Sequence, residues 1–109
     1  MPLYIITGSY TPAAMKGMIA KPSNRESATK ALVESSGGKL RSYYLTTGDN
    51  DFMMVVEAPN GTNLIAPLVV ASASGTVSNL KTVQAFTSAE FTAAQKKAGE
   101  IASRYKPAG

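Results

Sequence analysis

The sequence predicts an α+β fold in which helices cover one face of a four-stranded antiparallel sheet. Short apolar segments with two-residue periodicity alternate with segments of helical periodicity. Capping residues and glycines separate these segments. The length of 109 residues, with 44% hydrophobic and 17% charged residues, is typical of one globular domain, so we expect a single domain over residues 1–109.

The first predicted strand, Tyr4 to Tyr10, begins almost at the first residue. Thr11 followed by Pro12 predicts a helix start, because a hydroxyl caps the first turn and proline loses no hydrogen bond there. Pro22 interrupts this helix.

A second helical segment follows directly. Ser23 and Glu26 match the S-x-x-E capping box that opens a helix. Gly37-Gly38 predicts its end, because glycine accepts the left-handed conformation found after a helix.

A β-hairpin is predicted next. From Leu40 to Thr46 the pattern alternates, which places Leu40, Ser42 and Tyr44 on one face and Arg41, Tyr43 and Leu45 on the other. Gly48-Asp49-Asn50 predicts a turn, and Phe52 to Ala58 predicts the second strand.

The second half of the chain repeats the order. Thr62 or Asn63 is the expected cap of a helix that reaches about Ser74, with distortion at Pro67. The segment Val77 to Phe86 is the fourth predicted strand.

A last helix is predicted after Thr87, where Glu90 completes another capping box. Its apolar stripe consists of Phe91, Ala94, Ala98, Ile101, Ala102 and Tyr105.

The complete order is β-α-β-β-α-β with an added C-terminal helix, which is the ferredoxin-like arrangement. Its two main helices cover one face of the sheet only. The strands are nonetheless apolar at both parities: Phe52 and Met54 oppose Met53 and Val55. A strand that is apolar on both faces needs both covered. We therefore expect a homodimer or higher homo-oligomer, with a second sheet packed against the first.

Composition restricts the chemistry. Without cysteine or histidine, the chain lacks thiolate chemistry and the usual metal ligands, so we expect no metal and no cofactor. The net charge of +4 is dispersed, which argues against nucleic acid as a partner. No apolar run is long enough for a membrane span, and the N-terminus does not resemble a signal peptide, so a cytoplasmic protein is expected.

The chain resembles the GYD-domain family along most of its length, from Tyr4 to Glu90. The resemblance is carried by the segments Tyr43-Tyr44-Leu45-Thr46-Thr47-Gly48-Asp49-Asn50-Asp51, Val56-Glu57-Ala58-Pro59, Gly37-Gly38-Lys39-Leu40 and Gly75-Thr76-Val77, together with Arg25 and Thr82 to Phe86. Asn50 stands where the family has an aromatic residue, so a role for that ring does not carry over. The resemblance implies a dimeric α/β barrel and no established activity.

Two carboxylates are candidate ligand-binding groups. Asp51 is either a functional carboxylate at the rim of the sheet or a turn residue that accepts backbone hydrogen bonds. Glu57 shares strand parity with Met53 and Val55. It is either a partly desolvated carboxylate with a raised pKa, suited to proton transfer, or a strand-end group paired with Arg25, Arg41 or Lys81.

Two further candidates are Arg25 and Tyr44. Tyr43 and Tyr44 must point to opposite faces, one into the core and the other, taken to be Tyr44, toward a ligand. Arg25 lies in the first turn of a helix, where the helix dipole disfavours a cation. This predicts a specific anionic partner, either Asp51, Glu57 or a ligand carboxylate.

Two functions are compatible with these residues. The first is binding or processing of a small organic molecule in a pocket between sheet and helices; whether the chain is an enzyme stays open. The alternative is a non-enzymatic oligomeric module with a structural or regulatory role. A cavity of roughly 300 Å³ or more, with Glu57 and a tyrosine hydroxyl converging in it, would favour the first.

Overall fold

A computed structural model describes all residues 1–109. Its elements are β1 (Leu3–Tyr10), α1 (Pro12–Ala20), α2 (Arg25–Glu34), β2 (Lys39–Leu45), β3 (Phe52–Glu57), α3 (Gly61–Ala73), β4 (Val77–Ala85) and α4 (Ser88–Ala102). The strands form one antiparallel sheet in the order β2-β3-β1-β4. The predicted ferredoxin-like fold with an added C-terminal helix is confirmed.

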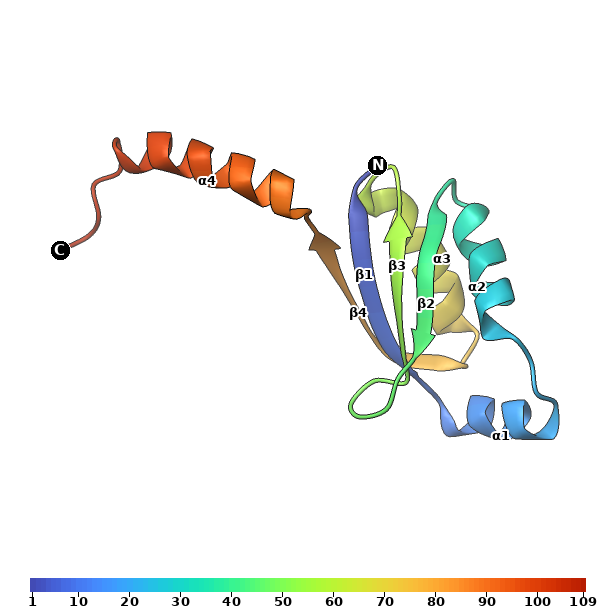
Figure 1. Ribbon diagram of the computed structural model, residues 1–109. Helices are drawn as coiled ribbons and strands as arrows, with labels where there is room; N and C mark the ends of the chain where they lie inside the picture. The colour runs from blue at the N-terminus through green and yellow to red at the C-terminus, as the bar shows by residue number, and fades with distance from the viewer.

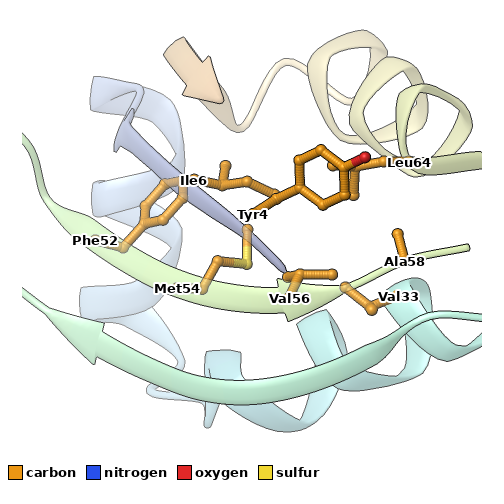
Figure 2. Packing of buried hydrophobic residues seen from close by; sticks show 8 residues of the cluster. All are labelled: Tyr4, Ile6, Val33, Phe52, Met54, Val56, Ala58 and Leu64. Atoms are coloured by element: carbon orange, nitrogen blue, oxygen red, sulfur yellow. The ribbon is translucent and has the colours of Figure 1, made fainter. Parts of the chain in front are cut away.

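The helices α2 and α3 lie on one face of this sheet (Figure 1). Between them and the sheet is a core of eight buried hydrophobic residues, shown in Figure 2: Tyr4, Ile6, Val33, Phe52, Met54, Val56, Ala58 and Leu64. Only 11 of the 109 residues are buried, so the core is thin.

The strand parity divides the sheet into a helix side and an open face. In β3, Phe52, Met54 and Val56 are buried against the helices. Met53 and Val55 alternate with them and point to the open face, where neither α2 nor α3 lies. The register places Ile5 of β1 opposite Val55. The expectation that the strands are apolar on both faces is therefore confirmed.

Both predicted helix caps in the middle of the chain are wrong by one to three residues. Helix α2 is capped by Asn24, whose side-chain oxygen accepts from the backbone N–H of Glu26 and Ser27. Glu26 is therefore the second helical residue and cannot close a box with Ser23. Helix α3 is capped by Asn60 rather than by Thr62 or Asn63. Asparagine caps a helix as well as serine does. In α3, Asn60 precedes both predicted residues, so the helix begins two to three residues earlier than predicted.

The predicted alternation in β2 is wrong at Leu40. The register with β3 shifts between Leu40 and Ser42, so Arg41 is an extra residue. Such a bulge reverses the parity on one side of it. Leu40 consequently packs against the core together with Tyr43, while Ser42 and Tyr44 lie on the open face.

Gly8 makes room for the Phe52 ring at the end of β1 that leads into α1. A Cβ atom there would lie 2.6 Å from the Phe52 ring and 2.7 Å from Leu80. The pairing of β1 with β4 is irregular at this point, where Asn79 has a positive φ of 53°. The absence of a side chain at Gly8 lets the Phe52 ring lie against β1.

Helices α1 and α4 contribute no buried residue. Figure 1 shows α4 projecting away from the sheet at the end of β4. The chain exposes 7529 Å², against about 5,800 Å² for a compact monomer of 11.4 kDa. Its radius of gyration is 17.9 Å, whereas a compact chain of this length has about 13 Å. The chain thus exposes more surface than a compact monomer would, and Val83, Phe86 and Phe91 are among its exposed large hydrophobic residues.

The core makes a direct stability prediction. Ile6 is 1% exposed, so Ile6→Ala should lower the free energy of unfolding by about 2–5 kcal/mol, because it leaves a cavity against Val56 and its neighbours. Ile19 is 81% exposed, and Ile19→Ala should change stability by less than about 0.5 kcal/mol. Urea unfolding of both variants measures the difference, and equal effects would contradict this description of the core.

Candidate functional site

A cleft of about 610 Å³ lies on the helix side of the sheet and is lined by residues of the sheet and of α1, α2 and α3. Of the 26 residues that line it, 17 are hydrophobic. Its floor includes Ile6 and Met54 of the sheet, and Leu68 of α3 forms part of its wall. Helix α1 stands away from the sheet (Figure 1) and has no buried residue, although several of its residues line the cleft.

One end of the cleft carries two tyrosine hydroxyl groups. Tyr10 and Tyr43 come from neighbouring parts of the sheet, and their hydroxyls form a hydrogen bond with each other. The Phe52 ring holds both in place: its centroid lies 5.2 Å from that of Tyr10 and 6.2 Å from that of Tyr43, whose ring is nearly parallel to it. The close approach at Gly8 therefore positions this hydroxyl pair.

Tyr43 stays un-ionised in this environment. Burial, and then its hydrogen bond with Tyr10, raise the pKa of the Tyr43 hydroxyl well above its ordinary value. The Arg25 guanidinium acts in the opposite direction on this pKa, but more weakly. The pair is therefore a hydrogen-bonding group and not a base at neutral pH.

Arg25 and Lys21 also line the cleft, and no aspartate or glutamate does. The expectation that Asp51 or Glu57 pairs with Arg25 is wrong: the two ion pairs of the chain are Arg41–Glu57 and Lys97–Glu100. Arg25 instead lies in the first turn of α2 and lines the same cleft as the tyrosine pair, where its charge acts to lower the pKa of Tyr43.

Asp51 forms hydrogen bonds with the backbone next to the hairpin turn. Its carboxylate accepts a hydrogen bond of 2.8 Å from the backbone N–H of Tyr10, while its own N–H donates to the carbonyl of Gly8. These bonds join the turn to the end of β1. Asp51 also lines a second, more open cavity of about 590 Å³ beside the cleft.

Tyr44 lies on the open face of β2 with 60% of its surface exposed, and it borders this second cavity but not the cleft. The prediction that Tyr43 and Tyr44 point to opposite faces is confirmed by the register of β2 with β3. The residue on the helix side, Tyr43, is the one whose hydroxyl reaches the main cleft.

Glu57 lies on the open face, outside both cavities. Its carboxylate accepts a hydrogen bond of 2.9 Å from the Arg41 guanidinium. This contact holds the pKa of Glu57 below its ordinary value, so the expectation of a raised pKa is wrong. The hydrogen bond from the Arg41 cation outweighs the opposing effect of desolvation on this carboxylate.

Of the four predicted ligand-binding residues, only Arg25 lines the cleft, and Tyr10, Lys21 and the hydroxyl of Tyr43 lie there without having been predicted. The signal for Tyr10 was available, since it shares the parity of Tyr4 and Ile6 on β1. Its partnership with Tyr43 depends on the pairing of β1 and β2 with β3, which the sequence pattern does not specify.

The side-chain oxygen of Asn50, which stands where the GYD-domain family has an aromatic residue, is buried without a hydrogen-bond partner. No group of three or more acidic side chains is close enough to hold a metal ion. None of the helices combines the length and the apolar character that crossing a membrane requires.

Comparison with known proteins gives a family and a fold. The model of the GYD domain matches residues 4–94. No curated protein sequence matches the chain.

Two solved structures share the fold. MtbAldR superposes with a TM-score of 0.53 at 15% identity, covering 79% of this chain and 52% of that one. The transcriptional regulator NMB0573 from Neisseria meningitidis, solved as a complex with L-Met, superposes with a TM-score of 0.51 at 12% identity, covering 80% and 51%. The chain thus spans about half the length of either protein.

The Arg41–Glu57 pair makes a prediction about pH. Because the pKa of Glu57 is lowered in the folded chain, the pair stabilises the fold above the ordinary value of 4.5, and this contribution is lost as the pH falls through the lowered value. Glu57→Gln should therefore lower the melting temperature slightly at neutral pH, with no difference from wild type in strong acid. Thermal unfolding at both pH values checks this; a difference that grows in acid would contradict it.

Proposed function

The chain belongs to the GYD domain family, and from that premise we propose that it binds a small, largely apolar organic molecule in the cleft between the sheet and its helices. The observation that carries this proposal is the cleft itself. Its volume of about 610 Å³ falls within the 300–1,000 Å³ that small-molecule sites occupy. A mostly hydrophobic lining with a few converging polar groups is the usual composition of such sites.

The chemistry of the lining favours binding over catalysis. The cleft holds no carboxylate, imidazole or thiol group. The hydroxyl of Tyr43 remains protonated at neutral pH, since burial raises its pKa. The groups that usually act as general base or nucleophile are therefore missing from the cleft.

The shared fold adds limited support. NMB0573, which shares this fold, was solved as a complex with the small organic molecule L-Met. At 12% identity this concerns the fold and not the ligand. The proposal for the present chain therefore depends on its own cleft.

A second proposal concerns the open face, which we assign to a second copy of this chain. Its apolar members are Leu3, Ile5, Tyr44, Met53, Val55, Val83 and Ala85. The chain exposes about 1,700 Å² more than a compact monomer of its mass. A standard interface buries about 800 Å² of each partner, so burial of the open face together with packing of the projecting α4 would account for a surplus of this size.

The two proposals use opposite faces of the sheet and do not compete. The cleft lies on the helix side, whereas a second copy would cover the open face. The alternative function, a non-enzymatic oligomeric module, rests on the open face alone and predicts an assembly that binds no ligand in the cleft.

Ligand binding is tested by filling the cleft. The neutral fluorescent probe N-phenyl-1-naphthylamine should bind the wild-type protein with increased emission. Ala28 lines the cleft from α2, and Ala28→Phe should reduce this binding about ten-fold or more, because the ring occupies the space. Ala31 is exposed on the same helix outside the cleft, so Ala31→Phe should bind as wild type does. Equal binding by all three proteins would refute the site.

Self-association can be tested by introducing a charged side chain on the open face and measuring the mass of the protein in solution. Val83 is 59% exposed there, and Val83→Glu should convert the dimer to a monomer, because burying two facing carboxylates is costly. Val69 is also 59% exposed but lies on α3, and Val69→Glu should leave the dimer intact. Sedimentation velocity measures both masses. A monomeric wild-type protein, or a dimer in both variants, would contradict the assignment.

A further inference from the structure

The charges around the cleft are all of one sign. Lys21 and Arg25 line it, and none of the seven acidic residues of the chain does. Glu26 and Asp51 line the second cavity, as Arg25 does, yet neither forms an ion pair with Arg25. Asp51 is bonded to the Tyr10 backbone instead. A guanidinium that is half-buried beside an apolar cleft thus lacks an anion.

The hydrogen-bond donors at this end of the cleft are also in surplus. Two hydroxyls, those of Tyr10 and Tyr43, share one hydrogen bond, so one of their two protons is left for another acceptor, which is either the nearby Thr29 hydroxyl or a ligand. The neighbouring hydroxyl of Thr29 donates to the backbone carbonyl of Arg25. Arg25 itself offers only donors. The missing partner is therefore an acceptor that carries negative charge.

The remainder of the cleft is apolar. Ile6 and Met54 on the sheet and Leu32, Leu64 and Leu68 on the helices line it. These side chains have no hydrogen-bonding groups, so this part of the cleft suits an aliphatic or aromatic body. A ligand that satisfies both parts has an anionic head and an apolar body.

We propose that the cleft selects organic carboxylates, with the carboxylate head at Arg25 and the Tyr10–Tyr43 hydroxyl pair and the apolar body between the sheet and α2 and α3. This inference rests on the proposed function and specifies its ligand class. The planar fork of a guanidinium matches the two oxygens of a carboxylate, and a hydroxyl adds a third hydrogen bond. The apolar body supplies affinity through burial, while the head sets the specificity.

The test compares three ligands with the same body: decanoate, the neutral decanamide and the cationic decylammonium, each below its micelle-forming concentration. Each displaces N-phenyl-1-naphthylamine from the wild-type protein. A hydrogen bond between charged groups is worth enough to give decanoate an affinity about ten-fold or more above that of decanamide. Decylammonium should bind most weakly, because Lys21 and Arg25 repel it.

Two variants assign the preference to Arg25. Arg25→Gln removes the charge and should bring decanoate to the affinity of decanamide. Lys30 is exposed on the same helix and does not line the cleft, so Lys30→Gln should keep the full preference. Equal losses in both variants would indicate attraction by net charge and would overturn the assignment to Arg25.

The outcomes separate this inference from the proposed function. If the three ligands displace the probe equally, and Ala28→Phe still abolishes probe binding, the cleft is a site but its ligand class is wrong. If the probe binds Ala28→Phe as it binds wild type, the proposed function itself fails. A preference for decanoate that only Arg25→Gln removes supports both.

Discussion

The structure depends on one constraint: a four-stranded sheet with two apolar faces has helices for only one of them. The central strands β1 and β3 alternate between residues buried under α2 and α3 and residues on the open face. Because both sets are apolar, no arrangement of this sheet with two helices satisfies both. The thin core follows from this deficit, and the uncovered open face adds to the large exposed area, to which the projecting α4 also contributes. The added helix α4 does not remove the deficit, since every residue of α4 is exposed.

On the face covered by α2 and α3, incomplete coverage by the helices leaves room for the cleft. Helix α1 is short and contributes nothing to the core, so the space beside α2 is bounded but not filled. Gly8, Phe52 and the two tyrosines pack together at the end of this space, with the Phe52 ring between the rings of Tyr10 and Tyr43. The cleft thus combines open space with the hydrogen-bonded hydroxyl groups of Tyr10 and Tyr43. For this reason we assign ligand binding to the helix side of the sheet rather than to the hairpin turn.

Much of the fold could be predicted from the sequence, because the signals are local. The alternation in Phe52 to Glu57 and the capping box at Thr87 and Glu90 place their elements within a residue. The bulge at Arg41 could not be predicted, since it is a property of the pairing of two strands. For the same reason the site was only partly anticipated. Arg25 was identified from its misplacement on a helix, whereas the Tyr10–Tyr43 contact requires the completed sheet.

The most direct test of this two-faced sheet is the access of a soluble paramagnetic agent to individual methyl groups, measured by NMR relaxation over a range of protein concentrations. Methyl groups of Ile5 and Val83 on the open face should be shielded at high concentration and become accessible on dilution. That of Ile19 on α1 should be accessible throughout. If Ile5 and Val83 relax as fast as Ile19 at every concentration, the open face has no partner copy and the account is wrong.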